Sequence, residues 1–178
     1  MLDNQSIEKD ICNNKLRCVK ENRFILCENG WVYFKIYGIG RKENDVLTKF
    51  LPNLLKQLQF QKFFFLRYAE EGKHLRIRFQ FAAEEYAYEG LKKIKIWVSD
   101  LMKRGLVNRV VYDTYERETS RYGGIKLISL AEELFYADSL FVLGILTYFD
   151  LQNSDDRALV FTVGICCLLY TSPSPRDS

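Results

Sequence analysis

A strict alternation of polar and apolar residues over residues 74–81, HLRIRFQF, constrains this chain more than any other feature. Successive side chains of a β-strand point to opposite faces, so this segment predicts a strand with one apolar and one largely basic face. The preceding segment 62–68, KFFFLRY, is also typical of a strand, and the polar turn AEEGK joins the two. We therefore predict a β-hairpin whose apolar face packs against helices.

The remaining periodic segments extend this hairpin into a complete α+β pattern. Residues 31–37 and 106–117 alternate as strands do, whereas residues 45–58, 84–104 and 125–149 carry apolar residues at helical spacing. Pro52 removes a backbone donor and predicts a break in the first helix. The order strand, helix, strand, strand, helix, strand predicts a ferredoxin-like βαββαβ fold. We expect an antiparallel sheet with both helices on one face and additional C-terminal helices.

Charge and cysteine content narrow the classes of function. The chain has 26 Lys and Arg against 23 Asp and Glu, and its net charge of +3 is too small to predict a polyanion partner. Five cysteines without CxxC spacing or a Cys-His cluster favour reduced thiols, with neither a disulfide framework nor a metal site. Because there is no secretory signal and no apolar run long enough to span a membrane, we expect a cytoplasmic protein.

The ends of the chain differ in composition from its middle. Residues 1–22 are polar and aperiodic, so we expect a loose lead-in before an ordered domain over residues 23–166. Residues 167–178 end in TSPSPRDS directly after an apolar stretch, and CLLYTSPSPRDS resembles translated adaptor sequence. We expect a non-native tail there; a genuine polar tail is the alternative. The apolar stretches 140–149 and 158–169 would then lack a packing partner, which predicts poor solubility or oligomers.

The basic strand face is the candidate binding surface. Alternation places Arg76 and Arg78 on one side, and neighbouring strands can add Lys35 and Arg117. Such a face can simply be solvated, or its guanidinium groups can bind a carboxylate or phosphate through paired hydrogen bonds. His74 is the single histidine, and a lone histidine on a strand is more often structural than catalytic. An RNA-recognition module is disfavoured, because arginines stand where its strand requires stacking aromatic rings.

Four motifs carry a family resemblance: WVYFKIYG at 31–38, FFFLRYAEEGKHLRIRF at 63–79, DTYERETSRYGG at 113–124 and AEELFYADS at 131–139. In this order they resemble the C-terminal domain of lantibiotic dehydratases, also called the thiopeptide-type bacteriocin biosynthesis domain. The resemblance covers roughly residues 24–160. It implies elimination of glutamate from glutamylated Ser or Thr of a precursor peptide, giving dehydroalanine or dehydrobutyrine.

The same resemblance implies partners and leaves alternatives open. The partners are a ribosomal precursor peptide with a leader and a glutamylation domain or partner protein. Neither a cofactor nor direct tRNA binding is expected for this domain. One alternative is the stand-alone reaction that forms the pyridine ring of thiopeptides, and another is a non-catalytic fragment that binds precursor peptide.

The resemblance also assigns residues by motif. It implies that Arg76, Arg78 and Arg117 are the elimination arginines, and we add Arg121, Lys35 and Tyr68 as substrate-binding residues. The family's acid/base histidine lies in a C-terminal segment that this sequence does not contain, so the base is left unassigned. We therefore expect a domain truncated at its C-terminus, with lyase activity conditional on the missing segment.

Overall fold

The computed structural model describes residues 24–25, 29–69, 72–149, 153–156 and 158–159. These residues fall into two units, one up to Leu140 and one from Phe141 on. The predicted lead-in at 1–22 and tail at 167–178 lie outside the described residues. The strands are β1 (Phe24–Ile25), β2 (Trp31–Tyr37), β3 (Lys62–Tyr68), β4 (His74–Gln80), β5 (Arg109–Tyr112) and β6 (Tyr115–Glu116). The α-helices are α2 (Glu43–Asp45), α3 (Leu51–Gln57), α4 (Glu84–Lys103) and α5 (Ile125–Tyr148), and α5 passes from the first unit into the second.

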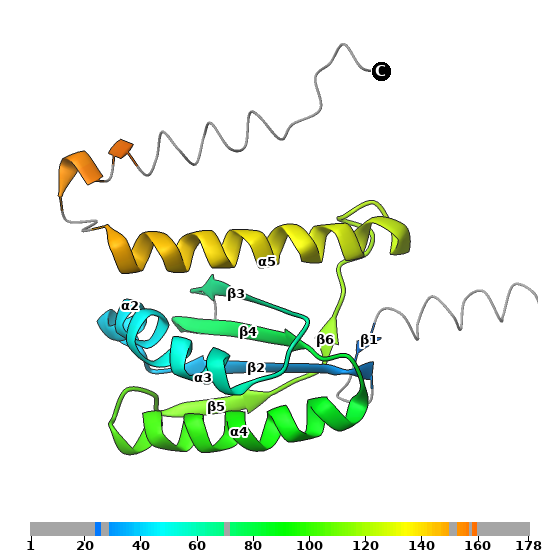
Figure 1. Ribbon diagram of the computed structural model, residues 1–178, viewed down its shortest axis with the longest axis horizontal. Helices are drawn as coiled ribbons and strands as arrows, with labels where there is room; N and C mark the ends of the chain where they lie inside the picture. Colours follow the sequence, from blue (N-terminus) through cyan, green and yellow to red (C-terminus); the bar gives the residue numbers. More distant parts are fainter. Residues whose placement is uncertain (1–23, 26–28, 70–71, 150–152, 157, 160–178) are drawn as a thin grey trace, which may run out of the picture. The chain divides into compact units, whose positions relative to one another are not determined.

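The first unit is built on a four-stranded antiparallel sheet, which confirms the predicted α+β class. Its strands lie in the order β3-β4-β2-β5, with helices around them (Figure 1). The register pairs Lys35 with Arg76 and Tyr33 with Arg78, so these four side chains share one face. The opposite face carries Phe34, fully buried, whose ring meets Trp97 of α4 edge to face.

The chain between β2 and β3 forms the first helical layer. It begins with a 3-10 turn at Gly40–Lys42 and α2, continues as a π-helical stretch at Val46–Phe50, and becomes α3 at Leu51. Pro52 stands in the first turn of α3, directly after the change from π-helical to α-helical hydrogen bonding. The chain stays helical through Glu43–Gln57, so the expected break is a change of helix type rather than an interruption. The indole of Trp97 donates to the carbonyl of Phe50 and joins α4 to this segment.

The prediction of one continuous strand over residues 106–117 is wrong. It divides into β5, at the edge of the main sheet, and β6, which pairs with β1 in a separate two-stranded sheet. The break falls at Asp113, whose N–H donates to the carbonyl of Tyr33 and whose carboxylate accepts from the N–H of Thr114. This local turn competes with the strand ladder and carries the chain away from β2. Arg117, which follows β6, is consequently not on the main sheet.

The sheet face that carries Arg76 and Arg78, here called the arginine face, is not simply exposed to solvent. Trp31, Tyr33, Phe64 and Tyr115 form a buried cluster there, and Phe135 of α5 packs against it. Up to Leu140, α5 lies along the edge strand β3 (Figure 1), where the hydroxyl of Ser139 accepts from the N–H of Phe65. An edge strand otherwise exposes its backbone donors, so this contact protects the sheet from pairing further. Aromatic side chains therefore cover part of this face, and the opposite face packs against α4.

Candidate functional site

Arg78 is the most unusual residue on this face, because its guanidinium is buried among aromatic rings. The residue is 7% exposed, and its Cζ lies 4.3 Å from the ring centre of Tyr33, 4.6 Å from that of Tyr115 and 5.3 Å from that of Phe64. Its Nε and Nη1 have no hydrogen-bond partner among the described residues. Burial lowers the pKa of Arg78 from its usual value. A buried cation with unused donors is a strong attractor for an anion.

Arg76 lies beside it, two residues away on the same strand face, and is held by different contacts. Its Cζ lies 3.5 Å from the ring centre of Tyr68, which is a close cation–π geometry. Its Nε donates to Nε2 of His74 at 3.1 Å. The other ring nitrogen of His74, Nδ1, lies 2.8 Å from the carbonyl oxygen of Gly72. The buried ring of His74 stacks on Tyr37.

Both arginines line one cavity of about 450 Å³, here called the arginine cavity. Its lining combines cationic, acidic and aromatic side chains: Tyr33, Lys35, Arg76, Arg78, Asp113, Thr114, Glu116 and Glu118. Within it Lys35 donates to Asp113 over 2.6 Å. This hydrogen bond raises the pKa of Lys35 and lowers that of Asp113. Burial raises the pKa of the Tyr33 phenol, which keeps it protonated.

A smaller cavity of about 70 Å³ also borders Arg78, and two further residues that the sequence analysis assigned to the site line it. Tyr68 and Arg121 are among its lining residues, together with Tyr115 and Glu118. Arg121 donates to Glu118 over 3.1 Å, and both side chains are exposed. The structure thus gathers Lys35, Arg76, Arg78, Tyr68 and Arg121 around two adjoining cavities.

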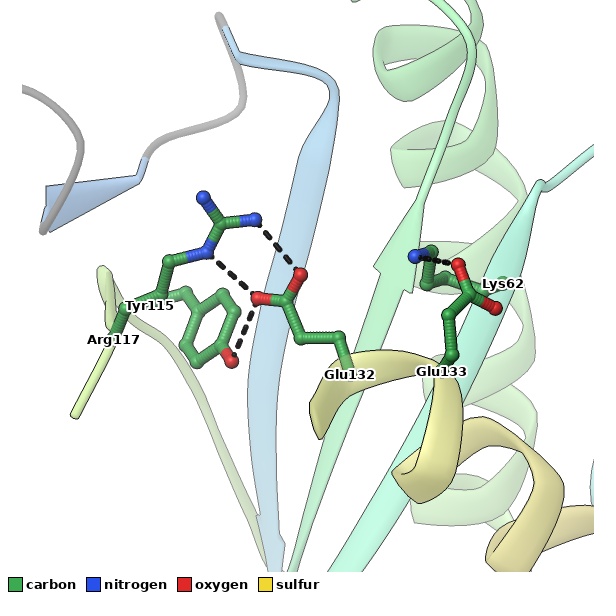
Figure 2. A network of polar contacts seen from close by, with 5 residues as sticks. All are labelled: Lys62, Tyr115, Arg117, Glu132 and Glu133. Atoms are coloured by element: carbon green, nitrogen blue, oxygen red, sulfur yellow. Dashed lines mark hydrogen bonds and ion pairs between the residues drawn. The ribbon is translucent and has the colours of Figure 1, made fainter. Parts of the chain in front are cut away.

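Arg117 is held elsewhere, in a buried ion pair with α5. Its Nε and Nη2 donate to the two carboxylate oxygens of Glu132 over 2.7 and 2.8 Å (Figure 2). The Tyr115 hydroxyl donates to the same carboxylate over 3.1 Å, and burial raises the pKa of this phenol strongly. Glu132 is 1% exposed, so Arg117 neutralises a buried charge. Arg117 is not among the lining residues of either cavity.

Several residues of the site have no clear sequence signal. Tyr33, Phe64 and Tyr115 belong to alternating strand segments, where an aromatic side chain is equally expected in a core. Glu132 lies in a helical segment, AEELFYAD, in which a carboxylate is usually solvent-exposed. The one signal in the sequence is the pair of adjacent acids at 132–133 in a mostly apolar helical segment, where Lys126 and Asp138 are the other charged residues.

The part of the chain that the structure describes contains neither a cluster of metal-ligating side chains nor a helix suited to span a membrane. No three His, Cys, Asp or Glu side chains gather closely enough there to hold a metal ion. No helix among those residues is both long and apolar enough to span a membrane.

Comparisons with known proteins place this geometry in a family. A family model described as the lantibiotic biosynthesis dehydratase C-terminus matches residues 31–174. The nisin biosynthesis protein NisB of Lactococcus lactis is 31% identical over 141 residues, which are 76% of this chain and 14% of that protein. The subtilin biosynthesis protein SpaB of Bacillus subtilis is 34% identical over 112 residues, which are 61% of this chain and 11% of that protein.

A solved structure agrees with these sequence matches. The tRNA-dependent lantibiotic dehydratase MibB from Microbispora sp. 107891 superposes with a TM-score of 0.62 at 27% identity. The superposition covers 68% of this chain and 12% of that one, so this chain spans a small part of its relatives' length. Because the family model covers most of the sequence, the chain belongs to the family of lantibiotic dehydratase C-terminal domains.

Proposed function

We propose that this domain eliminates glutamate from glutamylated Ser or Thr residues of a ribosomal precursor peptide. The observation that carries the proposal is the buried guanidinium of Arg78, whose Nε and Nη1 have no partner among the described residues, beside Arg76 in the arginine cavity. Membership of the lantibiotic dehydratase family supports it, since dehydration is the activity in that family's name. Under this proposal the partners are a leader-bearing precursor peptide and a glutamylation domain or protein.

The elimination step needs an anion site and a base. A base takes the α-proton of the esterified residue, the Cα–Cβ double bond forms, and the Cβ–O bond breaks so that glutamate leaves with its carboxylate. Negative charge grows on that carboxylate, and paired guanidinium donors of Arg76 and Arg78 stabilise it. Asp113, Glu116 and Glu118 line the same cavity and can accept protons. Lys35 and Tyr68, with Arg121 beyond them, complete the proposed substrate-binding surface.

Arg117 acts only indirectly in the proposed mechanism. Its bidentate pair with Glu132 holds the carboxylate that accepts from Tyr115, and the Tyr115 ring covers Arg78. We propose that Arg117 supports the wall of the site and that Arg76 and Arg78 bind the leaving carboxylate. The ion pair occupies the same donors that a substrate carboxylate would need.

The fold proposed with this function is ferredoxin-like. A helical connection separates β2 from β3, a hairpin joins β3 to β4, and α4 leads into β5. The strand order β3-β4-β2-β5 and the antiparallel pairings support this topology. The domain boundaries at residues 23 and 166 and the cytoplasmic location stay predictions.

A pre-glutamylated precursor peptide tests the function directly. Incubated with the 178-residue chain and followed by mass spectrometry, the peptide should lose one glutamic acid per modified residue. An unchanged peptide that still binds the protein would favour the docking fragment over the enzyme. A dehydroalanine-containing peptide that cyclises, while the glutamylated peptide stays intact, would favour the pyridine-forming reaction.

A further inference from the structure

His74 and Arg76 form a hydrogen-bonded pair whose geometry restricts the histidine to one protonation state. A carbonyl oxygen can only accept, so the 2.8 Å contact with Gly72 requires a proton on Nδ1. A guanidinium N–H can only donate, so the 3.1 Å contact from Arg76 Nε requires a free lone pair on Nε2. Both contacts are satisfied together only by the neutral imidazole that carries its proton on Nδ1.

The surroundings of His74 fix the ring in this orientation. The residue is 3% exposed, and its ring lies 4.5 Å from that of Tyr37 and 5.7 Å from that of Tyr68, measured between centroids. Tyr68 also stacks on Arg76, so one tyrosine restrains both partners. The ring is thus held by side chains from neighbouring strands, Tyr37 of β2 and Tyr68 of β3, and by Arg76 of its own strand.

We propose that neutral His74 is a positioning residue that fixes the guanidinium of Arg76 toward the arginine cavity through the lone pair of its Nε2. The orientation of Arg76, and with it the binding of an anion in the cavity, therefore depends on this acceptor. The consequence for elimination rests on the function proposed above, whereas the contact itself does not.

Nuclear magnetic resonance on the 178-residue chain tests the contact without any substrate. His74 is the single histidine, so all imidazole nitrogen signals belong to it. Long-range proton–nitrogen spectra should show the Nδ1–H tautomer, and the Arg76 Nε–H should exchange slowly with water. Arg104, whose Nε donates to Asp100 on α4 and whose side chain is 57% exposed, should exchange faster and is the internal reference.

Two variants distinguish the effect of the Nε2 lone pair of His74 from the effect of its aromatic ring. His74→Phe keeps an aromatic ring between the tyrosines but has no acceptor, so the protected Arg76 signal should be absent. His74→Gln supplies an amide oxygen that can accept, so the signal should persist. In the elimination assay the Phe variant should lose at least about tenfold in rate, as for a lost hydrogen bond to a charged group. The Gln variant should restore most of the parental rate.

Failures of the two proposals are distinguishable. An Nε2–H tautomer in the parent chain, or an Arg76 Nε–H that exchanges as fast as that of Arg104, overturns the positioning role even where elimination proceeds. This measurement needs no variant, so a misfolded Phe variant does not prevent the decision. Conversely, the expected spectra from a chain that leaves glutamylated peptide intact support the His74–Arg76 pair and overturn the proposed function.

Discussion

Arg76 and Arg78 differ in how the protein holds them, and this difference decides what a substitution will do. Arg76 is half-buried and hydrogen-bonded to His74, whereas Arg78 is buried and surrounded by rings. The sequence places both on a polar strand face, and from that pattern alone a substitution of either should hardly affect folding. The structure corrects this for Arg78, because a buried side chain contributes to stability whatever its charge.

The first prediction concerns catalysis by these two residues. Arg76→Lys and Arg78→Lys keep the charge but lose the planar pair of donors that matches a carboxylate. Each should slow glutamate elimination by about 10²- to 10³-fold, comparable to the loss of one oxyanion-hole donor. The measurement is accumulation of glutamylated peptide by mass spectrometry, with Arg104→Lys on α4 as the matched control. Elimination at the parental rate in both variants would show that the arginines are structural.

Arg78 should also limit the stability of the domain. Two of its nitrogens are unpartnered, and burying an unsatisfied polar group costs about 1–3 kcal/mol, partly offset by the surrounding rings. Arg78→Met replaces the cation by an apolar chain of similar length. We expect the free energy of unfolding in urea to rise by about 1 kcal/mol while elimination is lost. A fall of the same size would mean that the cation–π contacts outweigh desolvation.

Asp113 adds a pH dependence at the rim of the cavity. Its pKa is lowered in the folded state by Lys35, so its contribution is present above its unfolded pKa and is lost as pH falls through its folded pKa. Because the Asp113 side chain is 41% exposed, we expect only about 0.5 kcal/mol. The parent chain should therefore exceed Asp113→Asn in urea stability at neutral pH, and the gap should close below about pH 4. A gap that stays constant with pH would exclude the ion pair as its source.

At the scale of elements, the first half of α5 is attached to the sheet unit by two neighbouring carboxylates in different environments. Glu132 is buried against Arg117 and Tyr115, whereas the half-exposed Glu133 pairs with Lys62 of β3 (Figure 2). A buried carboxylate stabilises only while its partner is present, whereas a half-exposed carboxylate stays hydrated and contributes less, although the Lys62 side chain is only 12% exposed. The two residues therefore provide a matched comparison one position apart.

Glu132→Gln should lower the free energy of unfolding by about 3 kcal/mol, because it leaves the Arg117 guanidinium buried without a counter-charge. Glu133→Gln should change it by less than about 0.5 kcal/mol. Chemical denaturation of both variants measures the difference. Combining Glu132→Gln with Arg117→Met should recover part of the loss, since neither charge then remains unpaired. Equal effects of the two single substitutions would contradict the role of burial.

At the scale of the whole molecule, the outer side of α5 carries an apolar stripe. Leu127, Leu130 and Leu134 are 51%, 59% and 62% exposed and recur at helical spacing. Their proximity on one helix face makes a contiguous patch, which promotes association in a way that a single exposed apolar residue does not. The expectation of oligomers from the sequence rested on residues 140–149 and 158–169, and this stripe is a separate observation that leads to the same expectation.

We expect the 178-residue chain to self-associate at micromolar concentration through this stripe. Leu130→Glu with Leu134→Glu should shift it toward a monomer in size-exclusion chromatography with light scattering. Ile96→Glu on α4 is the control, since Ile96 is 72% exposed but has no exposed apolar neighbour one turn away on that helix. A monodisperse parent chain would show that the stripe does not drive association.

The sequence by itself determined the order of the main-sheet strands and of the helices between them, the change of helix type at Pro52 and the sharing of one strand face by Arg76 and Arg78. These features depend on period-two and period-3.6 patterns and on the missing N–H of proline, which act within a few residues. Its motifs also determined the family. These parts of the prediction needed no knowledge of which elements touch.

Only the tertiary structure decided how the arginines are used. Arg78 is buried because β2, β3 and β6 bring rings around it, and Arg117 is occupied because Glu132 arrives from α5. The turn at Asp113 that takes Arg117 off the sheet depends on the Tyr33 carbonyl in another strand. The charge and shape of a strand residue are local, but its partners and its exposure to water depend on segments distant in the chain, and no pattern within one strand encodes them.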